Sequence, residues 1–146
     1  SIPKIIKKVI EDGKKIVVVS NTPQSKLFGE KELNRFDRFI FENNNNELPS
    51  SSQLKQIEER FYEDYVSGQH KVNKDLRAIV ERFSDDRVVY KERSDFMCSK
   101  AEKRCYMYFP KDEAKVIWDY GHTTTDGARV LGRLITERQW LSDFSQ

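Results

Sequence analysis

The fold is decided by residues 15–20, which read Lys15-Ile16-Val17-Val18-Val19-Ser20. Four β-branched residues in succession favour a strand, and a run without alternation is typical of a strand covered on both faces. We therefore expect the central strand of a parallel sheet here. Asn21-Thr22-Pro23 follows at the carboxyl end of this strand, the edge where open α/β sheets bind ligands, so Asn21 is a candidate to line a pocket.

Helical and extended patterns alternate along the rest of the chain. Apolar residues spaced by three and four predict helices over residues 2–12, 30–41, 53–66, 72–83 and 125–140. A second strand is expected at residues 87–90, and residues 105–109 and 114–118 are expected to pair as a hairpin. We expect Trp118 and Trp140 to fill the core. This alternation predicts the α/β class.

Length and charge exclude several classes of protein. The 146 residues suit a single domain. Charged residues make up 34%, but the net charge is only +2, so there is no broad basic field and we expect no nucleic-acid partner. The longest apolar runs are far shorter than the ~20 residues that span a bilayer. The sequence starts at Ser1 without a signal-like segment, and we expect it to be part of a longer protein.

A candidate catalytic pair occurs in Asp119-Tyr120-Gly121-His122, between the expected strand ending at Trp118 and the helix from Thr125. A carboxylate three residues before a histidine can orient the imidazole and leave its other nitrogen to exchange a proton. The alternative is a carboxylate that only binds backbone amides at the helix start, beside an exposed histidine. The other histidine, His70, is expected to be solvated between two helices.

The two cysteines, Cys98 and Cys105, allow two interpretations. A disulfide would close a loop of about eight residues, worth roughly 2.5 kcal/mol, and would indicate an oxidising compartment. Two free thiols in a cytosolic protein fit the spacing equally well. No further Cys or His pair stands at finger-like spacing and no glycine-rich phosphate loop is present, so we expect neither a metal nor a cofactor.

Residues 96–134 resemble the C-terminal part of the SGNH (GDSL-like) hydrolase superfamily, above all the SGNH domain of membrane-bound carbohydrate O-acyltransferases. The resemblance lies in the loop from Cys98 to Cys105, then Asp119-x-x-His122, then Gly127-Ala128. Thr123 and Thr124 stand where the family usually has Leu and Ser, and a threonine can still cap the helix.

The resemblance implies a flavodoxin-like three-layer α/β fold, with a mostly parallel sheet and a small hairpin near the cysteine loop. It implies a Cys98–Cys105 disulfide and a Ser-His-Asp mechanism that uses His122 and Asp119. The family's Gly-Asp-Ser motif does not occur here, so residues 1–146 are expected to be a single, partial SGNH domain without its nucleophile-bearing part. Ser20 ends a strand as a nucleophile would, but lacks a flanking Gly-Asp.

The resemblance also implies a function, namely transfer of an O-acyl group such as acetyl to a carbohydrate, or its hydrolysis. Tyr120 and Asn21 are the candidate substrate contacts. The expected partners are an acylated carbohydrate or acyl donor, and a multi-pass membrane acyltransferase domain in the same parent chain, with this domain on the extracytoplasmic side. The chain alone is expected to be inactive. The alternative is a non-catalytic α/β binding or interaction module.

Overall fold

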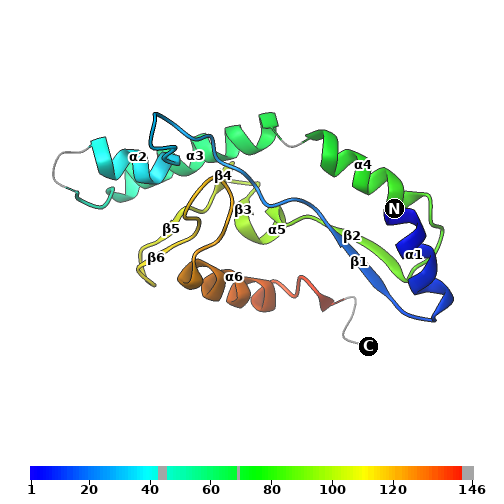
Figure 1. The fold of residues 1–146 in the computed structure, drawn as a ribbon. Coiled ribbons are helices and arrows are strands. Elements are labelled where there is room, and N and C mark those ends of the chain that lie inside the picture. The colour runs from blue at the N-terminus through cyan, green and yellow to red at the C-terminus, as the bar shows by residue number, and fades with distance from the viewer. Residues whose placement is uncertain (43–45, 69, 143–146) are drawn as a thin grey trace.

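The computed structural model describes residues 1–42, 46–68 and 70–142, with the backbone alone at residue 70. Its helices are α1 (Ile2–Glu11), α2 (Arg35–Glu42), α3 (Ser51–Gly68), α4 (His70–Glu81), α5 (Ser94–Met97) and α6 (Thr125–Glu137). Its strands are β1 (Ile16–Val19), β2 (Val88–Lys91), β3 (Cys98–Ser99), β4 (Arg104–Cys105), β5 (Tyr108–Phe109) and β6 (Ala114–Lys115) (Figure 1). The mixed α/β class is confirmed.

The predicted helices are present with shifted ends. The largest shift is in α2, which begins at Arg35 and not at residue 30. Gly29 and Glu32 take positive φ in a turn closed by a Phe28–Leu33 bridge, and this turn occupies the expected first part of the helix. No helix among the described residues has both the length and the apolar character that crossing a bilayer requires. The expected solvation of the His70 side chain lies outside the described part.

The strand at residues 16–19 has fewer neighbours than its sequence indicates. β1 pairs in parallel with β2, from Ile16 opposite Val88 to Val19 opposite Lys91. A small core covers one face of this pair, built from α1, α4 and the two strands around Ile6, Val80 and Val88. Within the described residues β1 pairs with β2 alone and is only half-buried, so β1 does not hold the predicted central position there. The β-branched run predicts correctly that residues 16–19 form a strand, but which strands lie next to it depends on other segments of the chain.

A larger core lies between α3 and α6, where the two antiparallel hairpins β3–β4 and β5–β6 pack (Figure 1). The hairpin predicted around Pro110 is present as β5 and β6, with shorter strands than expected. The described strands form one parallel and two antiparallel pairs, so they do not make the expected mostly parallel sheet. The flavodoxin-like three-layer arrangement stays a prediction.

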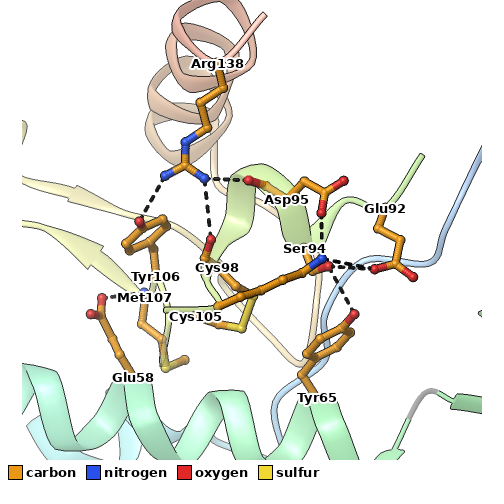
Figure 2. The surroundings of a disulfide bond; sticks show 11 residues. Glu58, Tyr65, Glu92, Ser94, Asp95, Cys98, Cys105, Tyr106, Met107 and Arg138 are labelled. Carbon is orange, nitrogen blue, oxygen red and sulfur yellow. Dashed lines mark hydrogen bonds and ion pairs between the residues drawn. A yellow bond between two sulfur atoms is a disulfide. The ribbon is translucent and has the colours of Figure 1, made fainter. Parts of the chain in front are cut away.

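The disulfide implied by the resemblance is confirmed: Cys98 and Cys105 lie opposite each other across β3–β4 and are bonded. Figure 2 shows it between α3, which carries Glu58 and Tyr65, and Arg138 just after α6. The Arg138 guanidinium donates to the backbone oxygen of Asp95 at 2.5 Å and to the Tyr106 hydroxyl at 3.1 Å. The cysteine loop therefore joins the two helices that flank the larger core.

Glu58 on α3 brings a carboxyl group into this core. Its Oε1 accepts a 2.9 Å hydrogen bond from the Met107 backbone N–H, and Arg104 Nη1 lies 3.7 Å from Oε2. Burial raises the pKa of Glu58 to about 7, although the Met107 hydrogen bond and the Arg104 charge both lower it. Between pH 4.5 and about 7 the folded protein thus keeps a proton that the unfolded chain releases.

Raising the pH through this window should therefore lower the free energy of unfolding, by about 3 kcal/mol, because one pKa unit corresponds to about 1.4 kcal/mol. Glu58→Gln should remove this fall, since the amide oxygen can still accept from Met107 and carries no charge. Urea unfolding at several pH values measures it. Glu59→Gln, on the neighbouring half-exposed carboxylate, is the control and should behave as wild type. An unchanged pH dependence in Glu58→Gln would contradict the assignment.

Candidate active site

The loop between β6 and α6 is organised by the Asp119 carboxylate. Its Oδ1 accepts hydrogen bonds from the backbone N–H groups of Gly121 (2.9 Å) and His122 (2.8 Å), and its Oδ2 lies 2.6 Å from His122 Nδ1. Burial raises the pKa of Asp119, but the hydrogen bonds from Gly121 and His122 lower it more, so the net shift is downward. An ionised carboxylate only accepts, so Nδ1 carries the proton and Nε2 is the basic nitrogen.

The His122 ring contacts two aromatic side chains. Trp118 stacks on it with ring centroids 5.9 Å apart, and Tyr120 meets it edge-on at 5.2 Å. Trp118 is 60% exposed, so its predicted place in the core is wrong, whereas Trp140 packs against the larger core. Trp118 is exposed because the chain turns outward directly after Val116 and Ile117, which are both fully buried.

Contacts from distant segments hold this loop in place. The buried Asn34 side chain donates to the Asp119 backbone oxygen at 3.2 Å and caps α2 by accepting from the Asp37 N–H at 2.9 Å. The Ser25 backbone N–H donates to the Tyr120 backbone oxygen at 2.7 Å. Sequence reasoning missed Asn34, although Asn34-x-x-Asp37 before a helix is a recognisable capping signal.

The start of α6 fixes the other end of the loop. Thr124 caps the helix by accepting from the Gly127 N–H at 2.8 Å, and its hydroxyl donates to the Lys115 backbone oxygen. Gly127 lies so close to Val116 that a Cβ there would be 2.4 Å from the Val116 oxygen. A glycine is therefore required for α6 to pack against the segment that leads into the loop.

His122 forms one wall of a cleft of about 270 Å³ at the carboxyl ends of β1 and β2. These ends point toward the middle of the molecule in Figure 1. The cleft is lined by Val19, Ser20, Asn21, Thr22, Gln24, Arg93, Tyr120, Gly121 and His122. The structure therefore brings the predicted residues Asn21, Tyr120 and His122 together. Sequence reasoning missed Gln24 and Arg93, although Arg93 follows β2 as Asn21 follows β1.

Ser20 also lines this cleft, but its hydroxyl is engaged. It is buried, and its Oγ donates to the Asn21 backbone oxygen at 3.1 Å and accepts from the Arg93 N–H at 2.9 Å. These bonds tie the end of β1 to the segment after β2. This environment is that of a structural serine.

The comparison with known families identifies the chain. A family model described as the SGNH domain (fused to AT3 domains) matches residues 4–137. The chain belongs to this SGNH family. No curated protein and no solved structure matches it. SGNH domains of this family are described as fused to AT3 acyltransferase domains, which is a membrane-protein context. The family description indicates an acyl-transfer or hydrolase type of activity.

The two glycines of α6 allow a direct test of how the helix is seated. Gly127→Ala should lower the free energy of unfolding by about 1–3 kcal/mol, since the new methyl group forces α6 away from Val116. Gly132→Ala is the matched control: nothing lies within 4 Å of its Cβ position, so it should stabilise the helix by up to about 1 kcal/mol. Urea unfolding of both variants measures the difference. Equal stability of the two would contradict this packing.

Proposed function

We propose that this SGNH domain supplies the acid–base pair of a Ser-His-Asp site, which transfers an O-acyl group such as acetyl to a carbohydrate or hydrolyses it. The observation that carries the proposal is the 2.6 Å contact between Asp119 Oδ2 and His122 Nδ1, with the ring facing a cleft. The bond orients the ring, and the cleft gives an ester access to it. An imidazole placed in this way can act as a general base.

In the proposed reaction, His122 Nε2 takes the proton of a serine hydroxyl as that oxygen attacks the ester carbonyl. The C–O bond to the leaving alkoxide then breaks, the imidazolium returns its proton to that oxygen, and the acyl group stays on the serine. A sugar hydroxyl or water then attacks this acyl-serine as Nε2 takes its proton, and the serine oxygen leaves and recovers a proton from the imidazolium. Asp119 stabilises the imidazolium and keeps its own negative charge throughout. The lowered pKa of Asp119 supports this role, because the carboxyl group resists protonation.

The nucleophile in this proposal is a serine of the SGNH domain outside residues 1–146. Two observations support it. The sequence has no Gly-Asp-Ser, and the Ser20 hydroxyl is buried and already hydrogen-bonded on both its donor and acceptor sides. The same missing part would supply further strands of the flavodoxin-like sheet. Asp119 and His122 would then be inactive without that serine.

The lining of the cleft favours a carbohydrate as the substrate. The Thr22 hydroxyl and the Asn21 and Gln24 amides line the same cleft as Tyr120. Sugars present hydroxyl groups to such side chains and apolar ring faces to aromatics. We assign Asn21 and Tyr120 as substrate contacts. The disulfide supports placement on the extracytoplasmic side of the membrane, where thiols are oxidised.

The alternative of a non-catalytic binding module shares part of this geometry. In it, Asp119 would only accept hydrogen bonds from backbone amides, and the structure contains two such bonds. That role leaves the contact to the ring and the placement of His122 in a cleft unexplained. Both features favour catalysis.

Replacing the base provides the main test, in the intact parent protein. His122→Ala should lower kcat for acyl transfer by about 10³–10⁴-fold, because the attacking hydroxyl loses its proton acceptor. Stability should not change, because the His122 side chain is largely exposed. Thr123→Ala is the control, on an exposed neighbour in the same loop, and should keep full activity. Turnover retained by His122→Ala would disprove the assignment.

Ser20 can be tested without turnover. A fluorophosphonate probe, which labels activated serines, should leave Ser20 of residues 1–146 unmodified because its hydroxyl is buried and hydrogen-bonded. Mass spectrometry of the treated chain gives the result. An adduct on Ser20 would show that the nucleophile lies within this chain.

A further inference from the structure

Arg93 brings a positive charge to the cleft that contains His122. It lies two residues after the end of β2 and is held by the loop that follows β1. Its Nη1 donates to Thr22 Oγ1 at 2.7 Å, and its backbone N–H donates to Ser20 Oγ at 2.9 Å. Both partners line the same cleft. Arg93 is exposed, and the bond to Thr22 holds its guanidinium at the cleft.

Among the residues that the structure describes, the charge of Arg93 is not balanced by a carboxylate, unlike that of most arginines there. Arg35, Arg77 and Arg133, for example, pair with Asp64, Glu92 and Asp112 at 2.6, 2.6 and 2.8 Å. Within the described part of the chain, no Asp or Glu forms an ion pair with Arg93. Its sequence neighbours Glu92 and Asp95 instead contact Lys100, at 3.5 and 2.8 Å.

None of the described residues that line the cleft is acidic. Its described walls carry hydroxyl, amide, aromatic and imidazole groups beside the guanidinium. The carboxylate of Asp119 is turned to its own loop, where it is hydrogen-bonded to Gly121 and His122. A substrate that enters the cleft therefore meets a cation whose charge is uncompensated.

We infer that Arg93 binds an anionic group, a carboxylate or a phosphate, on the carbohydrate that occupies the cleft. This inference rests on the proposed function and narrows its substrate to acidic sugars. Arg93 Nη1 donates to Thr22, whereas Arg93 Nε and Nη2 make no hydrogen bond to any residue that the structure describes. These two nitrogens form the planar edge that binds carboxylate and phosphate oxygens in pairs. Arg93 is thus a specificity residue, and His122 remains the base.

The test compares charged and neutral sugars at low ionic strength, where an exposed charge is least screened. Methyl glucuronide, glucose 6-phosphate and methyl glucoside are titrated into the chain, and NMR signals of the Arg93 Nε–H and the His122 ring report binding. At least one acidic sugar should bind about tenfold more tightly than the neutral one, as expected for charge-assisted hydrogen bonds. Which acidic sugar is preferred identifies the anion.

Variants link the preference to this side chain. Arg93→Gln should abolish the preference for charge, and Arg93→Lys, which keeps the charge but loses the planar edge, should retain part of it. Arg82→Gln is the control, since Arg82 is an exposed arginine that does not line the cleft. It should keep the full preference. Urea unfolding of each variant separates loss of binding from loss of the fold.

Equal binding of the three sugars, binding of none, or a charge preference that survives in Arg93→Gln would overturn the inference. The titration needs no turnover, so its outcome is independent of the catalytic test. If His122→Ala loses activity but no charge preference exists, the anion subsite alone is wrong. If the charge preference holds but His122→Ala stays active, the catalytic role alone is wrong.

Discussion

A single carboxylate, that of Asp119, determines both the shape of its loop and the orientation of the imidazole in it. One oxygen accepts from two backbone N–H groups, and the other contacts the His122 ring. The loop and the ring therefore cannot be oriented independently. Because all three donors lie within three residues of Asp119, the sequence of the loop itself is sufficient to define this local geometry.

The position of the loop in the molecule depends on contacts that are distant in sequence. Asn34 holds the Asp119 carbonyl, Ser25 holds that of Tyr120, and Gly127 lets α6 approach Val116. Each contact uses a backbone atom on at least one side, so it fixes the path of the chain more than it selects a side chain. The imidazole is brought to the cleft by this framework, and the motif alone would leave its surroundings undefined.

The difference between local contacts and contacts that are distant in sequence explains what could be predicted. Apolar spacing predicted most of the helices, and the contact between Asp119 and His122 is short-range, so both were accessible from local patterns. The neighbours of β1, the exposure of Trp118 and the approach of Arg93 to His122 arise from tertiary packing. A run of valines is equally compatible with one partner strand or with two, and a tryptophan after two buried residues can turn either way.

Ser20 shows how the cleft is assembled from strand ends. Its hydroxyl bridges the Asn21 carbonyl and the Arg93 N–H, which fixes the spacing between the loops that follow β1 and β2. A hydroxyl used in this way cannot also attack an ester without releasing both loops. The same bond therefore argues against Ser20 as nucleophile and holds the Arg93 backbone at the cleft, while Thr22 holds the guanidinium. In the resulting cleft, the proposed base His122 belongs to the loop before α6, whereas Arg93, the proposed anion-binding residue, belongs to the segment after β2. The two proposed roles can therefore be altered separately, because they fall on different side chains from different elements.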